Sequence, residues 1–499
     1  MRFKVPEGVY DIIKSLEKAG FQAFLVGGSV RNILLGRPPK DWDVATDAEP
    51  KEILGLFPDS IYENAFGTVG IKAAASRVSG GEEGQTEIVE VTTFRREGKY
   101  SDLRHPDEVV FTKEIREDLA RRDFTVNAMA AGLGERGENG ETEISLVDPF
   151  GGQVDLKAKT IRAVGEPNRR FQEDALRLMR AVRFACELGF SIDPETSSAI
   201  KTNADLLEAI AKERIRDELV KMISSSRAVW GMEELEKFNL LKDILPELRE
   251  GIGVGQNKHH IYTVWEHNLK ALQYAVDKNY SLKVRLASLL HDVGKPKTKG
   301  GEGLNSTFYG HEVVGARMAR KMMERLHFSR ELTEEVTHLV RYHLFYYNVG
   351  EVSEAGVRRF IQRVGVENID DLLKVREADR IGSGVPKAVP YKLRHLQFMI
   401  EKVRADPISP KMLKINGSQL MELLSLDPGP RVGYILGVLL EEVLDDPEKN
   451  DEEQLRKRAR ELSDLDDEEL KRKASSAREK KNEFESGVED EMKKKFYVK

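Results

Sequence analysis

Two aspartates, Asp41 and Asp43, follow a pair of glycines, Gly27 and Gly28, that end a short apolar run. Residues i and i+2 of a β-strand point to the same face of a sheet, so a strand through the aspartates would set their carboxylates side by side. Two such carboxylates repel each other unless cations lie between them. Pairs of Mg²⁺ ions held by aspartates serve phosphoryl transfer, and this is the chemistry that the spacing predicts.

The two glycines predict the phosphate side of the same site. Gly27 and Gly28 let the backbone approach a triphosphate closely, and the helix expected directly after them offers N–H groups and the positive end of its dipole. Glu90, on a later strand, could bring a third carboxylate to the aspartates. An outward-facing glutamate on an amphipathic strand is the alternative. Together these features predict a site for a nucleoside triphosphate and its metal ions.

Further polar residues could contact the rest of such a nucleotide. The run from Arg121 to Ala130 contains arginine and asparagine, which can hold phosphates and ribose hydroxyls, although an N-capped helix with a basic start has the same composition. Asp174 and Arg177 share one face of an expected helix, where an ion pair within the helix is the ordinary meaning. They could instead read a base, because a carboxylate accepts from an exocyclic amine and a guanidinium donates to ring nitrogens or carbonyls. Cytosine and adenine carry such an amine, and uracil does not.

Eight of the ten histidines lie between residues 258 and 385. Imidazoles and carboxylates from separate helices of a bundle can converge on one or two divalent metals. The residues that we expect to form this metal site are His267, His291, Asp292, His311, His343 and Asp379. The remaining histidines of the region, His259, His260, His327 and His338, are expected to lie outside it.

The elements that must position these groups change in character along the chain. Up to about residue 160, short apolar runs alternate with turns and predict a small α+β head with a mostly antiparallel sheet. From about residue 165, apolar residues recur at helical spacing, so all later domains are expected to be all-α. The expected domains are a head over 1–160, a helical neck over 161–250, a metal-binding domain over 251–390, a helical body over 391–450 and a charged tail over 451–499, which is expected to be a solvated helix or a frayed end.

Composition narrows the class of protein. A chain of 499 residues exceeds one hydrophobic core, and it has neither a membrane-spanning apolar stretch nor a signal-peptide pattern. The single cysteine, Cys186, excludes an internal disulfide and a cysteine-based zinc cluster, and it is expected in the core of a protein from a reducing, cytoplasmic setting. The net charge of −6 neither indicates nor excludes nucleic-acid binding, because a local basic face can bind phosphates.

Several motifs occur in an order that resembles a known family. They are Gly27–Arg31, Asp41–Asp43, Glu90–Arg95, Arg121–Asn127, Asp148–Gly152 and Arg170–Arg177. Together they resemble the class II tRNA nucleotidyltransferases, the CCA-adding enzyme family, whose close relatives are the bacterial poly(A) polymerases. The resemblance covers roughly residues 10–240.

The resemblance implies a role for each matching residue. Asp41 and Asp43 would bind catalytic Mg²⁺, with Glu90 as the third carboxylate. The implied nucleotide contacts are Gly27, Gly28 and Arg31 at the triphosphate, Arg122, Asp123 and Asn127 near the ribose and phosphates, and Asp174 and Arg177, with Arg180 one turn on, as the protein template that selects CTP and then ATP. The implied partner is tRNA, recognised by its backbone and shape through basic side chains of the helical domains. Candidates are Arg169, Arg170, Arg183, Lys212 and Arg214.

The implied activity is template-independent addition of CCA to tRNA 3′ ends from CTP and ATP. An enzyme that adds only the terminal A, or a poly(A) polymerase, is the alternative. Residues 95–106 resemble the flexible loop with which CCA-adding enzymes switch from C to A, which favours full CCA or A addition. The chain departs from the family at Asn32, where an aspartate is usual; asparagine keeps the hydrogen-bonding capacity and loses the charge.

Residues 258–385 resemble the HD phosphohydrolase domain, which one subgroup of the family carries. The resemblance implies a metal-dependent phosphatase or phosphodiesterase, and retention of the fold without activity is the alternative. Residues 415–430 resemble the C-terminal body of such members. A more remote alternative is a nucleotide phosphohydrolase with a regulatory head, although the domain order argues against an alarmone synthetase–hydrolase. The sequence does not indicate an oligomeric state.

Overall fold

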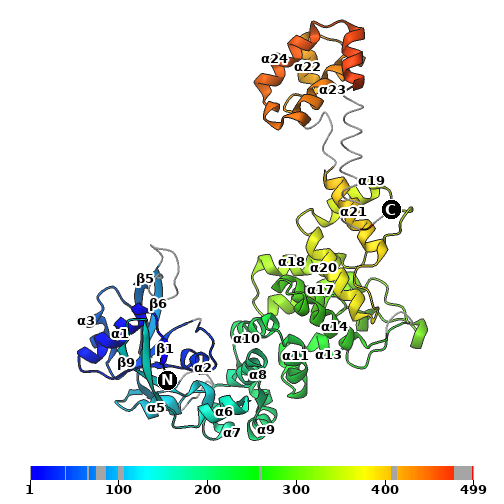
Figure 1. The fold of residues 1–499 in the computed structure, drawn as a ribbon. Helices are drawn as coiled ribbons and strands as arrows, with labels where there is room; N and C mark the ends of the chain where they lie inside the picture. Colours follow the sequence, from blue (N-terminus) through cyan, green and yellow to red (C-terminus); the bar gives the residue numbers. More distant parts are fainter. Residues whose placement is uncertain are drawn as a thin grey trace. The chain divides into compact units, whose positions relative to one another are not determined.

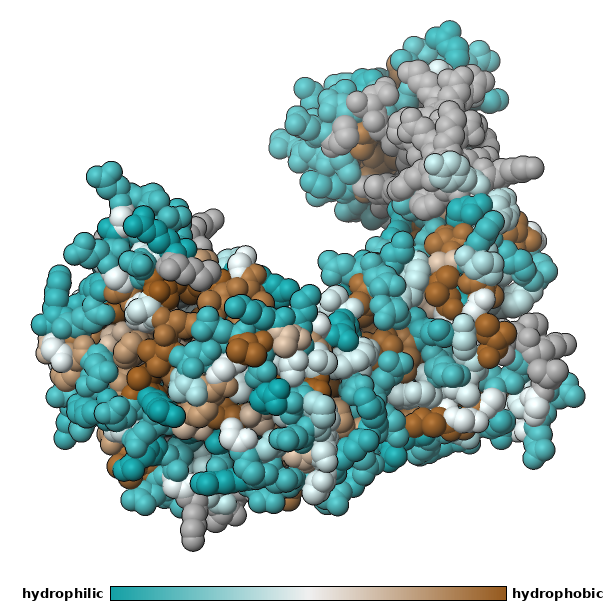
Figure 2. All heavy atoms as spheres, turned by 60° about the horizontal axis from the view of Figure 1, so that its bottom comes forward, coloured by the Kyte–Doolittle hydropathy of each residue, from teal (hydrophilic) through white to brown (hydrophobic). Residues whose placement is uncertain are grey.

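The computed structural model describes residues 2–39, 41–64, 67–74, 86–98, 100, 106–257, 261–405, 413–476 and 497 (Figure 1). They fall into two compact units, which are described separately. The first comprises residues 1–343 with 374–384, and the second comprises residues 344–373 with 385–499. No helix among the described residues has the length and apolar character that crossing a membrane requires. Hydrophilic side chains cover much of the face drawn in Figure 2.

An eight-stranded sheet forms the head, in the order β1-β10-β9-β2-β3-β6-β5-β4. The strands are β1 (Arg2–Lys4), β2 (Ala23–Val26), β3 (Asp43–Thr46), β4 (Ile61–Asn64), β5 (Thr68–Ala74), β6 (Thr86–Thr93), β9 (Ala130–Arg136) and β10 (Glu141–Val147). Every neighbouring pair is antiparallel except β3 and β6, which run parallel. The predicted mostly antiparallel sheet is therefore confirmed.

A cluster of buried apolar residues packs on this sheet. Val26 of β2, Ala45 of β3 and Ala130 of β9 pack with Phe94 and Leu119, all of them buried. Helices α1 (Glu7–Lys18), α2 (Gly28–Leu34) and α3 (Pro50–Leu56) pack against its strands. A separate antiparallel ribbon joins β7 (Arg95–Glu97) to β8 (Val109–Phe111). The flexible loop predicted over 95–106 lies partly outside the described residues, which omit Lys99 and residues 101–105.

Helices make up the neck. They include α7 (Pro167–Glu173), α8 (Leu176–Leu188), α9 (Pro194–Thr202), α10 (Lys212–Ser224) and α11 (Ala228–Lys237), whereas α5 (Ile115–Ala120) and α6 (Gly152–Ala158) belong to the head. A single 3₁₀ turn, η1 (Thr125–Asn127), precedes β9. The apolar residues Leu178, Met179, Val182 and Ala185 recur along α8 at helical spacing and are fully buried where α10 and α11 pack on it.

The region that we expect to bind metal is a bundle of helices that belong to the first unit, except for residues 369–373 at the start of α20. They are α14 (Val264–Asp277), α15 (Leu282–Leu290), α16 (Lys295–Thr298), α17 (His311–Arg325), α18 (Arg330–Tyr342) and α20 (Ile369–Gly382). Helix α14 starts with a reciprocal capping box between Thr263 and Glu266, which fixes the turn just before His267.

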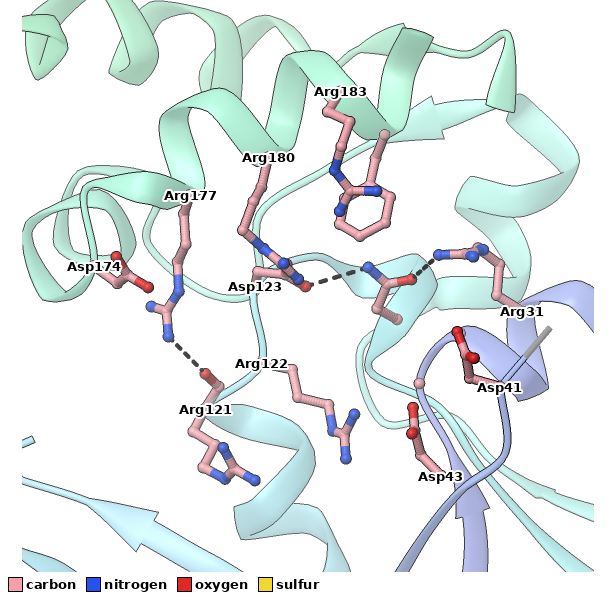
Figure 3. Close-up of a pocket in the computed structure, with 14 residues that line it drawn as sticks. Arg31, Asp41, Asp43, Arg121, Arg122, Asp123, Asp174, Arg177, Arg180 and Arg183 are labelled. Atoms are coloured by element: carbon pink, nitrogen blue, oxygen red, sulfur yellow. Dashed lines mark hydrogen bonds and ion pairs between the residues drawn. The ribbon is translucent and has the colours of Figure 1, made fainter. Parts of the chain in front are cut away.

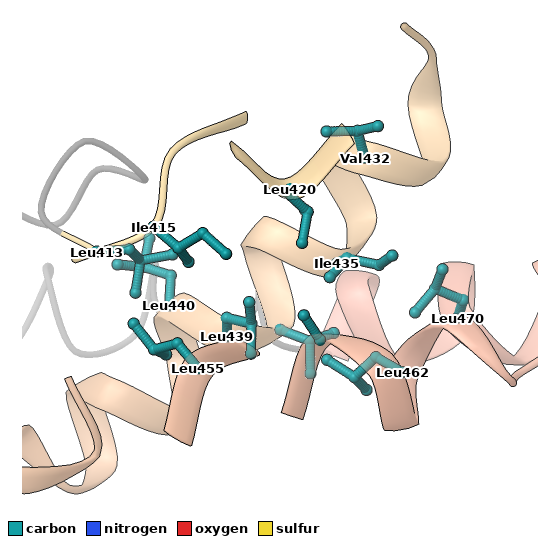
Figure 4. Packing of buried hydrophobic residues seen from close by; sticks show 12 residues of the cluster. Leu413, Ile415, Leu420, Val432, Ile435, Leu439, Leu440, Leu455, Leu462 and Leu470 are labelled. Atoms are coloured by element: carbon teal, nitrogen blue, oxygen red, sulfur yellow. The ribbon is translucent and has the colours of Figure 1, made fainter. Parts of the chain in front are cut away.

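The second unit contains helices α19 (Glu354–Val364), α21 (Tyr391–Ala405), α22 (Gly417–Leu424), α23 (Pro430–Asp445) and α24 (Glu452–Ser463). Helices α22, α23 and α24 share one apolar cluster, in which Leu420, Ile435 and Leu439 meet Leu455 and Leu462 (Figure 4). Helix α24 falls in the segment that we expected to be a solvated or frayed tail. Its apolar residues at positions 455, 459 and 462 instead form a buried stripe among charged neighbours.

Gly152, the first residue of α6, packs closely against the 3₁₀ turn η1. A Cβ atom at this position would overlap the carbonyl oxygen of Thr125 and the side chain of Met129, so Gly152→Ala forces a shift of η1. We expect a destabilisation of about 1–3 kcal/mol, read as a lower temperature of the first thermal unfolding transition. Gly55→Ala is the matched control, because Gly55 lies within α3 with open space around its Cβ position and alanine favours a helix. Equal transition temperatures for the two variants would contradict this packing.

Candidate active site

A polar cavity of about 500 Å³ lies between the head and helix α8. Residues predicted from the sequence that line it are Gly27, Gly28, Arg31, Asp41, Asp43, Arg122, Asp123, Asn127, Asp174, Arg177 and Arg180. Arg121, Arg183 and Phe184 line it as well. The fold thus brings together eleven groups that are spread over 154 residues of the chain, from Gly27 to Arg180.

The two aspartates project into this cavity from adjacent points of the backbone (Figure 3). Asp43 is the first residue of β3, whereas Asp41 precedes the strand in a bend, so the expectation that both lie on one strand was wrong. The carboxylates nevertheless face the same space. Burial raises the pKa of Asp43; Arg122 opposes that rise and Asp41 adds to it. Neither aspartate has an ion-pair partner within 4 Å among the residues that the structure describes.

Glu90 lies beside the aspartate pair without lining the cavity. In the parallel pairing of β3 with β6, Asp43 is opposite Glu90, and residues that are paired in this way point to the same face of a sheet. The side chain of Glu90 is exposed. Glu90 therefore lies on the strand next to β3, at the level of Asp43.

Gly27 leaves space in the cavity at the start of α2. It has φ +70° and ψ −130° at the N-cap of α2, a conformation that favours glycine. A Cβ atom here would lie 3.0 Å from Nη1 of Arg122 and 3.5 Å from Oδ2 of Asp43. A side chain at this position would therefore fill the space between the guanidinium and the carboxylate.

A chain of hydrogen bonds connects head and neck across the cavity (Figure 3). Nη1 of Arg31 donates to Oδ1 of Asn127 (2.6 Å), Nδ2 of Asn127 donates to Asp123 (3.3 Å), and Arg180 binds the other oxygen of Asp123 at 2.6 and 2.8 Å. Burial raises the pKa of Asp123, but Arg180 outweighs it and lowers that pKa to about 2. Burial, reinforced by the neighbouring charge of Arg183, lowers the pKa of Arg31 to about 10. These hydrogen bonds hold the guanidinium groups of Arg31 and Arg180 along one wall of the cavity.

The geometry of Asp174 and Arg177 corrects the sequence analysis. The helix is interrupted at Asp174, which is extended (φ −137°, ψ 106°) between α7 and α8 and accepts from the backbone N–H of Leu176. The two side chains therefore do not share a helical face, and they do not pair with each other. Asp174 instead binds Arg214 (2.9 Å), and Arg177 binds Glu173 (2.8 Å). Both still line the cavity.

Arg183 and Phe184 are functional candidates that the sequence analysis did not assign to the nucleotide site. Figure 3 shows Arg183 one turn beyond Arg180 on α8. Three guanidinium carbons surround the Phe184 ring: Arg183 at 3.8 Å, Arg180 at 5.1 Å and Arg31 at 5.4 Å from its centroid. The repeat of arginine at every third position of α8 was the available signal. Arg183 is buried and paired with Glu187, so it does not present a surface to tRNA.

All six predicted histidine and aspartate ligands converge in the metal-binding region. Oδ2 of Asp292 lies 2.9 Å from Nε2 of His267 and 3.4 Å from Nε2 of His291. Oδ1 of Asp292 lies 3.3 Å from Nε2 of His311 and 3.6 Å from Nε2 of His343. Oδ1 of Asp379 lies 3.4 Å from His267 and 3.7 Å from His291. Asp292 thus stands between two groups of ligands, each compact enough for one ion.

Backbone contacts prepare these imidazoles as ligands. Nδ1 of His291, His311 and His343 each meet a carbonyl oxygen three residues earlier, at 2.7–2.8 Å. A carbonyl only accepts, so Nδ1 carries the proton and a neutral ring directs the Nε2 lone pair into the cluster. Burial lowers the pKa of His343, which keeps its ring neutral. Nε2 atoms of His311 and His343 lie 3.3 Å apart, so their lone pairs repel unless a cation lies against them.

Two of the histidines that we expected to lie outside this cluster do so. His327 and His338 lie elsewhere, near Glu213 and Tyr342 respectively. His259 and His260 lie outside the described residues. Lys295 joins the cluster, where its ammonium lies 2.6 Å from Oδ2 of Asp292.

Three segments of the chain match known protein families. Residues 23–162 match the poly A polymerase head domain, residues 189–252 match the probable RNA and SrmB-binding site of polymerase A, and residues 264–382 match the HD domain. The chain is 35% identical over 438 residues to the A-adding tRNA nucleotidyltransferase of Deinococcus radiodurans. That alignment covers 84% of this chain and 91% of the relative.

Other relatives match over a shorter region. The CCA-adding enzyme of Lactobacillus helveticus is 48% identical over 212 residues, and that of Geobacillus thermodenitrificans is 44% identical over 240 residues. These alignments span 48% and 54% of the two relatives, about half of each. The crystal structure of the Bacillus stearothermophilus CCA-adding enzyme in complex with CTP aligns over 92% of this chain and 97% of its own, with 26% identity and a TM-score of 0.54.

The bridging position of Asp292 predicts how metal binding responds to substitution. Asp292→Asn keeps the shape of the side chain and removes the charge that both ligand groups share. We expect the variant to retain two fewer Mn²⁺ ions per chain than the wild type after gel filtration, measured by elemental analysis. His327→Gln, at an exposed histidine outside the cluster, should leave the Mn²⁺ content unchanged. An unaltered content in Asp292→Asn would mean that this cluster does not bind the metal.

Proposed function

The chain belongs to the family of tRNA nucleotidyltransferases and poly(A) polymerases, and from this premise we propose that it adds CCA to tRNA 3′ ends, taking CTP and then ATP without a nucleic-acid template. The observation that carries the proposal is that the aspartate pair, the glycine turn and Asp174 with Arg177 line one cavity. A nucleotide with its base at Asp174 and its phosphates at the glycines would contact all three. CCA-adding relatives and the structure of one of them with CTP support this substrate class.

Base selection would rest on Asp174 and Arg177. The carboxylate accepts from the exocyclic amine of cytosine or adenine, and the guanidinium donates to a ring nitrogen or carbonyl. Arg214 orients Asp174, and Glu173 orients Arg177. Because these partners come from the protein, the base can be read without a template strand.

Mg²⁺ would be held by Asp41 and Asp43, with Glu90 as the third carboxylate. The donors fit such an ion: both aspartates face one space, and neither has an ion-pair partner among the described residues. When bound, Mg²⁺ would lower the pKa of the attacking hydroxyl and neutralise charge on the departing pyrophosphate.

The reaction is an in-line displacement. The tRNA 3′-hydroxyl oxygen forms a bond to the α-phosphorus, and the bond from that phosphorus to the bridging oxygen breaks. The electron pair leaves with pyrophosphate, and the hydroxyl proton passes to solvent. Arg31 and Arg122 provide guanidinium donors to the phosphate oxygens, which favours the charge that develops during transfer. Asp123 and Asn127, which line the same cavity, would orient the ribose.

Two neighbouring activities remain as alternatives. The relative from Deinococcus radiodurans is an A-adding enzyme, so terminal A addition alone is the nearer one. A poly(A) polymerase is the other, supported by the match of the head. The loop resemblance of residues 95–106 favours an activity that includes A addition.

Binding of tRNA would use exposed cations of the helical neck, of which residues 189–252 match an RNA-binding family. Of the predicted candidates, Arg169 has a side chain that is 80% exposed and Lys212 is half-buried. Arg170 forms an ion pair with Glu173, and Arg214 forms an ion pair with Asp174. Surface recognition would therefore depend on side chains such as Arg169.

A second activity is favoured by the two-sided arrangement around Asp292. We propose that the helical bundle of the HD domain hydrolyses phosphate esters as a phosphatase or phosphodiesterase. The six ligands fit one or two divalent metals, and when bound the metals would supply a hydroxide at neutral pH. This activity would reside in residues that do not line the nucleotide cavity.

Two assays test the two activities: single-nucleotide incorporation into tRNA and hydrolysis of a phosphodiester. We expect purified protein to add two C residues to tRNA that lacks CCA when given CTP alone, and one A to tRNA ending in CC when given ATP alone. Asp43→Ala should abolish addition and retain hydrolysis of bis-p-nitrophenyl phosphate, whereas Asp292→Asn should do the reverse. Failure to incorporate C would contradict CCA addition; incorporation of A alone would select the A-adding alternative. Loss of both activities in either variant would contradict independent sites.

A further inference from the structure

Asp118, in helix α5, is a buried carboxylate that binds two arginines of the nucleotide cavity. It is fully buried and does not line the cavity itself. Nε of Arg121 donates to Oδ1 of Asp118 at 2.9 Å, and Nη2 of Arg121 lies 2.8 Å from the same oxygen. Nη2 of Arg122 donates to Oδ2 of Asp118 at 3.2 Å. One side chain thus holds two consecutive arginines, one with each of its oxygens.

The negative charge of Asp118 serves both arginines at once. Burial raises the pKa of this carboxyl, but Arg121 and Arg122 outweigh that effect, so the pKa is lowered overall. The backbone N–H of Arg95 also donates to Oδ1, at 3.4 Å. A buried carboxylate with charged donors on both oxygens holds each donor at a fixed position.

Arg121 connects Asp118 to the base-reading end of the cavity. Two acids bind its guanidinium, Asp118 and Glu97, and Oε1 of Glu97 lies 3.0 Å from Nη1. The backbone carbonyl oxygen of Arg121 accepts from Nη2 of Arg177 at 3.2 Å (Figure 3). Because the two acids hold the side chain, they also fix the carbonyl that orients Arg177.

Arg122 connects Asp118 to the aspartate pair. A Cβ atom at Gly27 would lie 3.0 Å from Nη1 of Arg122 and 3.5 Å from Oδ2 of Asp43, so this guanidinium reaches the space beside the carboxylates. The other terminal nitrogen, Nη2, is the one that binds Asp118. A change at Asp118 would therefore move a phosphate donor relative to the aspartates.

We propose that Asp118 is a positioning residue for both ends of the bound nucleotide. Through Arg121 it fixes the guanidinium of Arg177, and through Arg122 it fixes the donor beside the aspartate pair. This inference rests on the proposed nucleotidyl transfer, in which Arg177 reads the base. An asparagine at this position would release one arginine whichever way its amide turned, because the amide oxygen accepts from one of them and the N–H groups face the other.

The test measures base selection and rate in the full chain. In Asp118→Asn we expect kcat for CTP to fall, and the ratio of kcat/KM for CTP to that for UTP to fall about tenfold, as loss of one charge-assisted hydrogen bond implies. Glu97→Gln removes the other acid that binds Arg121 and should lower the same ratio, which provides a second variant if Asp118→Asn does not fold. Glu117→Gln is the matched control: this neighbouring acid of α5 pairs with Arg96 and does not line the cavity, so the variant should match the wild type.

A double-variant cycle tests the route through Arg121. If Asp118 acts on the base through this side chain, Asp118→Asn should change the CTP to UTP ratio much less when Arg121→Gln is already present. Additive changes in the ratio would contradict this route. An equal loss of kcat/KM for CTP and UTP in Asp118→Asn would mean that the carboxylate only stabilises the head.

Binding of CTP and UTP, measured by calorimetry, gives a readout that does not need turnover. The wild type should prefer CTP, and Asp118→Asn should lose about tenfold of that preference. If the wild type adds neither C nor A yet shows this difference, the proposed function fails and the positioning role stands. If the wild type adds both and Asp118→Asn keeps the full preference, the proposed function stands and the positioning role fails.

Discussion

The electrostatic repulsion between Asp41 and Asp43 is the constraint on which the rest of the nucleotide cavity depends. Their carboxylates face one space, and burial already raises the pKa of Asp43. The cavity is rich in arginine, but its guanidiniums bind other acids of the protein: Arg122 binds Asp118, Arg180 binds Asp123 and Arg183 binds Glu187. The positive charge of the walls is therefore held at fixed positions, while the aspartate pair still lacks a counter-ion among the described residues. A divalent cation with a triphosphate would neutralise the carboxylates and bind the guanidinium groups of the cavity walls.

The cluster in the HD domain also brings together groups that repel one another without a cation, but its ligands are different. Asp292 is buried among imidazoles whose protons are held at Nδ1 by backbone carbonyls, so their lone pairs converge. Each cluster thus concentrates like charges or lone pairs that a cation relieves. The two clusters have no lining residue in common, which is why separate activities can be tested by separate variants.

Much of this arrangement could be predicted from residue spacing. The mostly antiparallel head and the helical character of the later domains follow from apolar periodicity, and the ordered motifs located the groups that the fold gathers in the nucleotide cavity. The prediction that Asp174 and Arg177 share a helical face was wrong. A spacing of three residues indicates a shared helical face only if the helix is continuous, and here the backbone is extended at Asp174, where α7 ends before α8 begins. Arg183 was misjudged for a related reason, because its charge suggested the surface and its burial against Phe184 depends on tertiary packing. Likewise, Leu455 and Leu462 were hidden among charges, and only their partners in α22 and α23 reveal a core.

The central claim is that Asp41 and Asp43 act on the nucleotide through a bound cation, and the affinity for CTP tests it most directly. The dissociation constant of CTP should be measured by calorimetry for the wild type and for Asp41→Asn combined with Asp43→Asn, with Mg²⁺ and with a chelator. The account predicts a reversal: with Mg²⁺ the wild type binds CTP more tightly, and without it the neutral variant does, because two carboxylates no longer repel the phosphates. Equal affinities in both conditions, or weaker binding by the variant in both, would contradict it.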